Sequence, residues 1–315
     1  MLTTAAHELH SLYDPATSRK RLVLLAAQLT ALGRERAVAV VREFLATGTD
    51  APTRLEFALG NDGLLTGAPT LRVFLLDLTE RLDPAAAVTQ ARAILATPGS
   101  ADEWAVAMRS LAHAAPEARD LLTAKLHELL HNQLWRQSPS TGWLEAFDVA
   151  VYLGDVRFVS DLSELMRPAN GHVANHAAFL ALDRLAARDP ARVLSALLDS
   201  PETMQEREVA RAGMMARVDV QDAAQQALLE RYLLDPARSK AELDAFAGVY
   251  PNANTFISPN LLTTFPVVPS GTIARHDVVA AAVVTSWLAD ARFARLRPQL
   301  ERIHARLIEF TRLRR

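Results

Sequence analysis

Apolar residues recur every three or four positions along most of the chain. Leu71, Phe74, Leu75, Leu78 and Leu82 show this spacing, which places their side chains on one face of a helix. The alternation of apolar and polar residues that is typical of strands is nearly absent. The pattern therefore predicts an all-α protein.

Several helices are expected to begin at an Asp-Pro-Ala motif, which starts at Asp14, Asp83, Asp189 and Asp235. Asp can accept hydrogen bonds from the first free N–H groups of a helix, and Pro fits the first helical turn. Further prolines and glycines divide residues 70–250 into helices of roughly 10 to 19 residues with short links. Such regular short helices predict stacked antiparallel pairs.

An internal match supports this arrangement. Leu76-Asp77 with Asp83-Pro84-Ala85 recurs, at the same spacing, as Leu182-Asp183 with Asp189-Pro190-Ala191. Two further matches follow in the same order: Pro98, Glu103 and Val106-Ala107 with Pro201, Glu206 and Val209-Ala210, and Leu144 to Phe147 with Leu243 to Phe246. We therefore predict a single domain of residues 1–315 with a duplication, its copies covering about residues 70–153 and 176–250.

Over roughly residues 15–250 the chain resembles the HEAT/armadillo superfamily of α-solenoids in helix length, hairpin rhythm and leucine/alanine periodicity. The resemblance implies an α-α superhelix of antiparallel helix pairs. It also implies a curved surface that usually binds another protein and sometimes nucleic acid. It concerns architecture alone, because no residue motif of a specific family carries over.

The helical pattern breaks at residues 251–274, which contain no charged residue and are rich in proline and asparagine. The first copy of the duplication lacks this segment, so we call it the insertion. It is expected to be a non-helical loop before a C-terminal helical cap of residues 275–315. Two roles stay open: a plug that covers apolar helix surface, or a partner-binding loop with Asn254, Phe256, Asn260 and Phe265 as candidate contacts.

Charge and composition narrow the function classes. A formal net charge of −2 supplies no general attraction for nucleic acid. The absence of cysteine excludes disulfides, thiolate nucleophiles and Cys-ligated zinc, and it is compatible with a cytoplasmic location. The uncharged run Val278–Ala289 is much shorter than the roughly 20 residues that span a bilayer, so no membrane partner is expected. No cofactor is expected either.

One motif has the spacing of a metal site. His127-Glu128-Leu129-Leu130-His131 reads H-E-x-x-H and looks like the zincin motif, in which two histidines bind zinc and the glutamate polarises water. Glu145 is the nearest candidate for a third ligand, although it follows too closely for that family. The duplication also pairs Leu126, Leu129 and Leu130 with Leu229, Tyr232 and Leu233. In the second copy Glu230, Arg231 and Leu234 therefore stand where the motif has His127, Glu128 and His131, which favours an ordinary scaffold helix. The zinc site is kept as the alternative. Apart from it, no metal ligand is expected.

Other polar groups are interpreted as structural. They are the pairs His172 and His176, His7 and His10, and Glu145 and Asp244. The last helix, Arg292 to Arg315, is locally basic and is interpreted as a cap, with nucleic-acid binding as the open alternative.

These observations favour a non-catalytic scaffold that binds a protein or peptide through the helical groove and the insertion. A zinc hydrolase at His127, Glu128 and His131 is the alternative from the enzyme class. Nucleic-acid binding through the C-terminal arginines is the third possibility.

Overall fold

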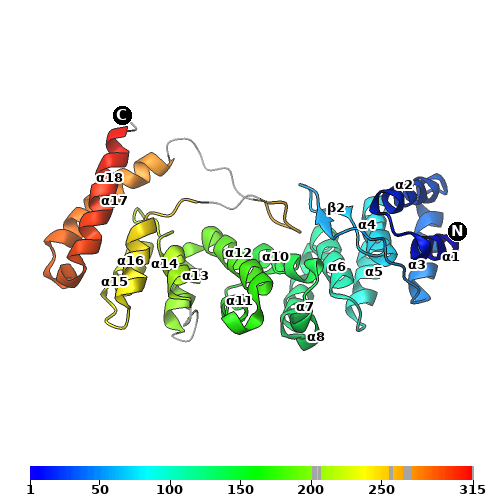
Figure 1. Cartoon of the computed structure of the whole chain (residues 1–315), viewed down its shortest axis with the longest axis horizontal. Coiled ribbons are helices and arrows are strands. Elements are labelled where there is room, and N and C mark those ends of the chain that lie inside the picture. The colour runs from blue at the N-terminus through cyan, green and yellow to red at the C-terminus, as the bar shows by residue number, and fades with distance from the viewer. Residues whose placement is uncertain (201–203, 205–206, 255–257, 265–271, 314–315) are drawn as a thin grey trace. The chain divides into compact units, whose positions relative to one another are not determined.

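The computed structural model describes residues 1–200, 204, 207–254, 258–264 and 272–313, and most of them are helical (Figure 1). This confirms the predicted all-α class. The chain forms two compact units. Unit 1 comprises residues 1–153 and 258–264, and unit 2 comprises residues 154–257 and 265–315. Part of the insertion belongs to each unit, and the single domain stays a prediction.

Unit 1 combines short helices with one small β-hairpin. Its elements are α1 (Leu2–Ser11), α2 (Pro15–Ala31), α3 (Arg34–Ala46), β1 (Ala58–Leu59), β2 (Leu65–Gly67), α4 (Leu71–Leu82), α5 (Pro84–Leu95), α6 (Ala101–Ala114), η1 (Pro116–Ala118), α7 (Arg119–His131), α8 (Gln133–Gln137), α9 (Thr141–Glu145) and α10 (Asp148–Leu153). Helix α4 packs on α5 and α6, and α6 packs on α7 and α9. Consecutive helices of this unit therefore cover one another's apolar faces.

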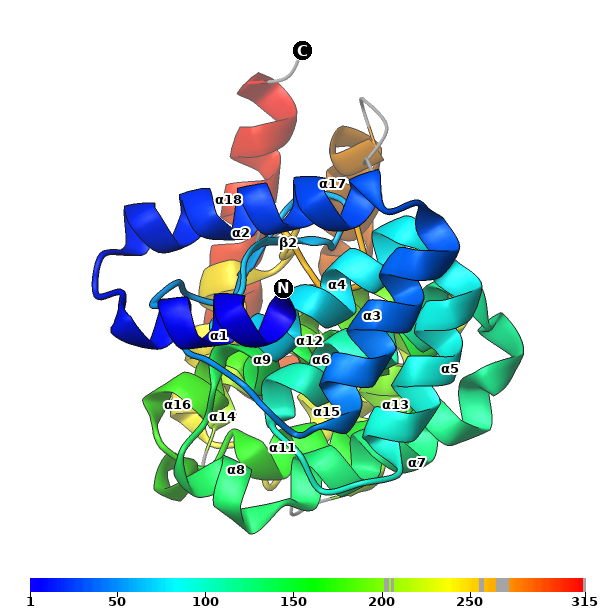
Figure 2. The same ribbon diagram turned by 90° about the vertical axis from the view of Figure 1, so that its right-hand side faces the viewer.

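The first helices share one hydrophobic core. Helices α1, α2 and α3 contact one another, and α2 and α3 both contact α4 (Figure 2). Leu9, Leu25, Leu29, Val41 and Leu75 have no solvent-exposed surface there. These side chains come from four different helices, so burial of the apolar faces holds the start of the chain together.

The hairpin between α3 and α4 was not predicted. Strand β1 pairs with β2 in antiparallel fashion, with Ala58 opposite Gly67 and Leu59 opposite Leu65. Strands this short contain too few residues to show alternation in the sequence. The buried carboxylate of Asp77 on α4 accepts a hydrogen bond from the Leu65 amide at 2.9 Å, which fixes the hairpin against the helix.

Unit 2 continues the helical pattern. Its elements are α11 (Phe158–Leu165), η2 (Pro168–Asn170), α12 (His172–Arg188), α13 (Pro190–Asp199), α14 (Glu208–Met215), α15 (Ala223–Leu234), α16 (Lys240–Val249), α17 (Thr272–Ala289), η3 (Ala291–Leu296) and α18 (Arg297–Leu313). Helix α12 packs on α11 and α13, α14 on α16, and α18 on both α16 and α17. Helix α17 begins at Thr272, slightly before the expected start of the C-terminal cap at residue 275.

Three of the four Asp-Pro-Ala motifs begin helices as predicted. The carboxylates of Asp14, Asp83 and Asp189 accept backbone hydrogen bonds at the starts of α2, α5 and α13. The prediction for Asp235 is wrong. It follows the end of α15, and Ser239 instead caps α16 by accepting a hydrogen bond from the Glu242 amide.

The two segments matched in the sequence have similar local structure. Asp77 on α4 and Asp183 on α12 are both 3% exposed. Each forms an ion pair with a buried arginine two helices later, Arg109 on α6 and Arg217 just after α14. The duplication itself stays a prediction.

Among the described residues, no helix is both long and apolar enough to cross a membrane.

Candidate functional site

A cavity of about 410 Å³ lies within unit 2. It is bordered by residues 216–221 after α14, by the start of the insertion at Pro251–Asn254, and by the first turns of α17. Phe310 of α18 also lines it. Because three chain segments and a helix far apart in the sequence meet here, we call it the unit 2 pocket.

The start of the insertion is anchored beside this pocket. The Asn252 amide donates to the Ala216 carbonyl at 2.8 Å, and Nδ2 of Asn252 donates to the Gly213 carbonyl at 3.1 Å. Nη2 of Arg217 donates to the Asn254 carbonyl at 2.6 Å. These contacts fix one wall of the pocket next to the end of α14.

Among the described residues that line the pocket, the one arginine is paired. Nε of Arg217 lies 2.5 Å from Oδ1 of Asp183, and Nη2 lies 2.8 Å from Oδ2. Both side chains are largely buried. Burial raises the pKa of Asp183, and the charge of Arg217 offsets this increase only in part. The guanidinium charge is therefore matched by a carboxylate behind the lining.

Two carboxylates and an imidazole also line the pocket, and a buried tyrosine comes just before the insertion. Oδ1 of Asp219 lies 3.6 Å from Nε2 of His276, and the neighbouring Asp277 is only 3% exposed. Tyr250, just before the insertion, is completely buried, and its hydroxyl forms no hydrogen bond within the described part of the chain. Burial raises the pKa of Tyr250, and the charges of Asp219 and Asp277 raise it further.

The structure describes two of the four candidate contacts of the insertion, and these two belong to different units. Asn254 is exposed and lines the unit 2 pocket. Asn260 belongs to unit 1, where it is 6% exposed and Nδ2 donates to the Thr263 carbonyl at 3.0 Å. Phe256 and Phe265 lie outside the described residues.

Residues 258–264 of the insertion pack into unit 1. The buried carboxylate of Asp148, at the start of α10, accepts hydrogen bonds from the Leu262 and Thr263 amides, both at 2.7 Å. It also accepts one from the Thr263 hydroxyl at 2.5 Å. The side chain of Leu261 is completely buried. We call residues 258–264 the docked segment, because backbone and side-chain contacts both fix it.

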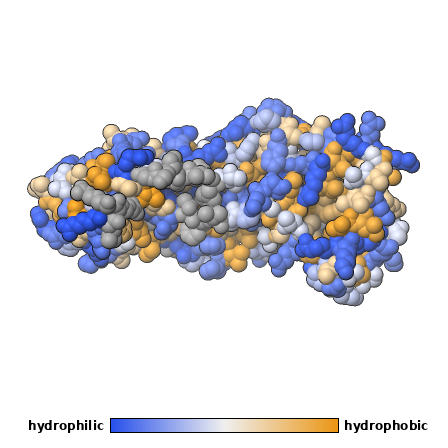
Figure 3. Space-filling view, turned by 90° about the horizontal axis from the view of Figure 1, so that it is seen from above, coloured by the Kyte–Doolittle hydropathy of each residue, from blue (hydrophilic) through white to orange (hydrophobic). Residues whose placement is uncertain are grey.

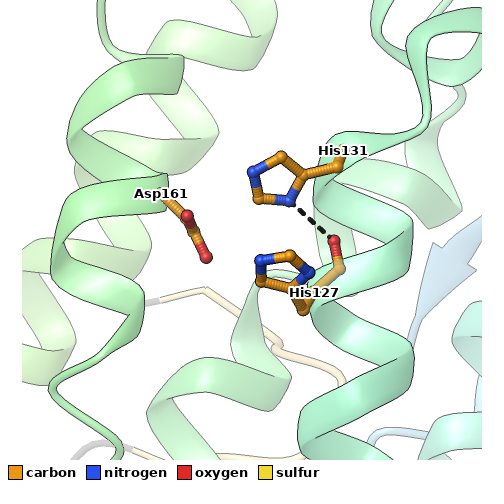
Figure 4. A group of neighbouring side chains, drawn as sticks. All are labelled: His127, His131 and Asp161. Carbon is orange, nitrogen blue, oxygen red and sulfur yellow. Dashed lines mark hydrogen bonds between the residues drawn. The ribbon is translucent and has the colours of Figure 1, made fainter.

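The H-E-x-x-H motif lies on α7, and its leucines are buried as predicted while both histidines are exposed. Nδ1 of His131 is 2.9 Å from the His127 carbonyl, and the two rings stack with their centres 4.1 Å apart (Figure 4). Glu128 forms an exposed ion pair with Lys125. Figure 4 also draws Asp161, which belongs to α11 of unit 2.

The expected third ligand does not join this pair. Among the described residues of unit 1, neither Glu145 nor any other carboxylate or histidine lies within 4.8 Å of both His127 and His131. Asp244, the other carboxylate considered for acid–base chemistry, has ion pairs with Lys240 and Arg302. The hydrogen bond from Lys240 is the main cause that lowers the pKa of Asp244. Its contacts are those of a structural group.

Arginines of the C-terminal segment donate hydrogen bonds to backbone carbonyls of neighbouring helices. Arg295 donates to the carbonyls of Leu233 and Asp235 at the end of α15. Arg306 donates to the carbonyls of Gly248 and Tyr250 at the end of α16. Cations at these positions satisfy helix-end carbonyls and interact well with the helix dipole. These contacts agree with a capping role.

A second cavity, of about 360 Å³, lies in unit 1 between α2, the β-hairpin and α4. Its lining is mainly apolar and includes Val23, which is 66% exposed. The part of unit 1 that carries α2, at the right of Figure 3, shows hydrophobic positions among hydrophilic ones. This cavity contains none of the candidate residues from the sequence.

The sequence reasoning missed Asp219, Tyr250, His276 and Asp277. They belong to no motif, and the only signal near them was the uncharged segment that follows Tyr250. The chain matches no protein-family model, no curated protein and no solved structure. The chemistry of the unit 2 pocket is therefore the basis for a functional hypothesis.

Proposed function

We propose that the protein is a non-catalytic binding scaffold of HEAT-like architecture, which holds a peptide segment of a partner protein in the unit 2 pocket. The observation that carries this proposal is the position of the insertion. Its first residues, Pro251–Asn254, form a wall of the pocket and are anchored by Asn252 and Arg217. A break in the helical pattern that is held in place at a cavity favours recognition of a ligand.

The size and lining of the pocket support a peptide. A volume of about 410 Å³ is within the range of ligand sites and has room for side chains of an extended segment. Asn254 offers an exposed amide, while Ile273 and Phe310 offer apolar contacts. This combination of a few polar groups with apolar surface is typical of recognition sites.

The proposed role does not include catalysis, because the groups in the pocket are arranged for structure and recognition. Arg217 is engaged by Asp183 and by the Asn254 carbonyl. Asp219 and His276, at 3.6 Å, are beyond ordinary hydrogen-bond distance. Catalysis by a nucleophile would need a base within hydrogen-bond reach of the reacting hydroxyl or water.

The experiment selects ligands from a displayed library of random dodecapeptides on the immobilised full chain. The probe variant is Asn254→Trp, which adds bulk at an exposed lining position. The matched control is Gln137→Trp, at an exposed position on α8. We expect selected peptides to bind the parent chain and the control equally and to lose at least tenfold in affinity for Asn254→Trp. Peptides that bind all three proteins alike, or a selection without enrichment, would contradict the proposal.

A further inference from the structure

A cavity of about 540 Å³ lies in unit 2, at the start of α16 and around the junction of η3 with α18. None of its lining residues lines the unit 2 pocket. Among the described residues, four cationic side chains and one carboxylate line this cavity, and we call it the basic pocket. These charged residues are Arg238, Lys240, Arg295, Arg302 and Asp244.

The carboxylates next to the basic pocket balance only part of its positive charge. Arg238 is matched from behind the lining, because its Nη2 lies 2.9 Å from Oδ2 of Asp235. Glu242 lies 3.8 Å from Arg238, but its carboxylate accepts two hydrogen bonds of 2.7 Å from Arg211. Asp235 and Asp244 thus face four cations, so two positive charges remain without a carboxylate in the described part of the chain.

The unmatched charge lies on Lys240, Arg295 and Arg302. Asp244 serves two of these cations, since it accepts from Nζ of Lys240 at 2.6 Å and from Nη2 of Arg302 at 3.3 Å. Arg295 forms no ion pair with a described carboxylate, and its Nη2 donates to two backbone carbonyls. Nε and Nη1 of both arginines donate no hydrogen bond among the described residues. Both side chains are exposed, so a ligand in the cavity has access to these donors.

Two further features indicate a positive potential at this place. Burial lowers the pKa of Arg306, and the charge of Arg302 lowers it further. The charge of Arg302 is therefore not cancelled by the carboxylate that it contacts. Helix α16 begins at Lys240, so the positive end of its helix dipole lies at the basic pocket. An anion in the cavity would be attracted by both the side chains and the helix.

The excess of positive charge is local. Two arginines next to the basic pocket in sequence have carboxylate partners outside it: Arg292 pairs with Asp290, and Arg297 pairs with Glu301. The unmatched cations are thus gathered at a cavity. A compact anion fits this arrangement better than a nucleic-acid backbone, which needs several phosphate contacts along a continuous surface.

We infer that the basic pocket binds a phosphate group, carried by a small ester or by a phosphorylated side chain. A phosphate monoester has a charge of about −1.5 to −2 at pH 7 and three strong acceptor oxygens. The charge matches the two unmatched cations, and the free guanidinium donors of Arg295 and Arg302 suit its oxygens. Lys240 adds an exposed ammonium group. A single carboxylate would match only half of the excess, and a cation would increase it.

Calorimetric titration of the full chain tests this site with three probes: O-phosphoserine, adenosine monophosphate and inorganic phosphate. We expect O-phosphoserine and adenosine monophosphate to bind at least about tenfold more tightly than serine and adenosine, which lack the charged acceptor. The probe that binds most tightly identifies the source of the phosphate group. The absence of binding by all three probes would overturn the inference, and it would leave the unit 2 pocket as a separate question.

Variants locate the site. Arg302→Gln and Lys240→Gln should each weaken binding of the tightest probe severalfold, whereas Arg292→Gln, an arginine of η3 that is paired with Asp290, should not. Asp244→Asn removes a negative charge from the lining and should tighten binding, a gain that partial unfolding cannot produce. Weaker binding in Asp244→Asn would show that this charge network only supports the fold, and it would overturn the inference.

Random-sequence DNA separates a pocket from a general basic surface. The inference predicts that DNA binds more weakly than the tightest phosphate probe at low salt. DNA that binds more tightly, and that Arg302→Gln and Arg292→Gln weaken alike, would overturn the site and indicate a surface that attracts phosphates without a cavity.

Discussion

Arg109 and Glu80 form an ion pair inside unit 1, with Nη2 of Arg109 2.9 Å from Oε2 of Glu80. The arginine has no exposed surface, and the same Nη2 lies 2.8 Å from Oδ1 of Asp77. Nη1 of Arg109 donates to the carbonyl of Gly63 in the hairpin turn at 2.8 Å. One buried guanidinium therefore joins α4, α6 and the β-hairpin.

We expect Glu80→Gln to destabilise the protein by roughly 3 kcal/mol, since it removes one partner of a buried ion pair and leaves Arg109 with Asp77 alone. The Ser110 hydroxyl, which donates to Glu80 at 2.6 Å, also loses a charged acceptor. Urea denaturation at pH 7 measures the effect. Glu117→Gln, at an exposed position, is the matched control and should change stability little. Equal stabilities of the two variants would contradict the structural role of the pair.

The contribution of Glu80 should depend on pH. Burial alone would raise the pKa of Glu80, but hydrogen bonds with His113 and Ser110 and the charge of Arg109 lower it to about 2, from 4.5 in an exposed chain. A carboxyl whose folded pKa is depressed stabilises the protein above the unfolded pKa, and this stabilisation is lost as the pH falls through the folded pKa. The stability difference between the parent and Glu80→Gln should thus shrink between pH 4.5 and pH 2. A difference that stays constant over this window would be inconsistent with the shift.

The helices could be predicted because their signals are local. The apolar spacing on α4 and the Asp-Pro caps at Asp83 and Asp189 involve neighbours within one or two turns. Asp235 misled the prediction because Ser239 and Glu242, a few residues later, form a competing helix start. The β-hairpin is fixed by Asp77, which lies several residues beyond the hairpin on α4. No local pattern within the hairpin therefore predicted it.

The candidate site was less accessible to sequence reasoning. Asp219, Tyr250 and His276 come from three separate segments, and each alone looks like an ordinary polar or aromatic residue. The uncharged run indicated the insertion, and of the two proposed contacts that the structure describes, Asn254 lines the unit 2 pocket. Asn260 has the same chemistry but packs in unit 1, because Asp148 binds the backbone beside it. Such pairings depend on tertiary structure.

Asp148→Asn should loosen the docked segment. The carboxylate accepts three hydrogen bonds from Leu262 and Thr263, and an amide side chain has only one acceptor oxygen to replace them. We expect the free energy of local opening to fall by roughly 2 kcal/mol, which lies within the range for hydrogen bonds to a charged group. Hydrogen exchange of the Leu262 and Thr263 amides measures this opening. Thr263→Val, which removes only the hydroxyl, should have a smaller effect, and unchanged exchange in Asp148→Asn would contradict the anchoring role.

Gly63→Ala should displace the docked segment through an overlap with Leu261. Gly63 has a φ of +74°, and a Cβ there would overlap the Leu261 carbonyl. Gly48→Ala is the matched control, since Gly48 has a φ of +71° but no neighbouring atom within 4 Å of such a Cβ. Both variants should lose about 1 to 2 kcal/mol from the left-handed backbone conformation. Only Gly63→Ala should also speed up exchange at Leu262, and equal exchange in both would show that the contact is unimportant.

The zinc alternative has a direct test. His127 and His131 are exposed on α7, and Glu145, the third ligand expected from the sequence, does not join them. A catalytic zinc site uses three protein ligands. We expect protein purified without a histidine tag, dialysed and analysed by mass spectrometry for metals, to contain well below one zinc per chain. His131→Ala should leave that content unchanged. Stoichiometric zinc that disappears in His131→Ala, but not in His172→Ala, would restore the hydrolase hypothesis.

We expect the basic C-terminal helix to stabilise the fold and not to bind nucleic acid. Arg306 donates to two carbonyls at the end of α16, so Arg306→Ala should destabilise the protein by roughly 1.5 to 3 kcal/mol, the range for hydrogen bonds to a charged group. Arg312→Ala, at an exposed position on the last turn of α18, is the control and should have little effect. Neither variant should alter binding to random-sequence DNA, because we expect none at low salt. Salt-dependent DNA binding that both substitutions weaken would favour the nucleic-acid alternative, since phosphate contacts contribute through charge and are screened by salt.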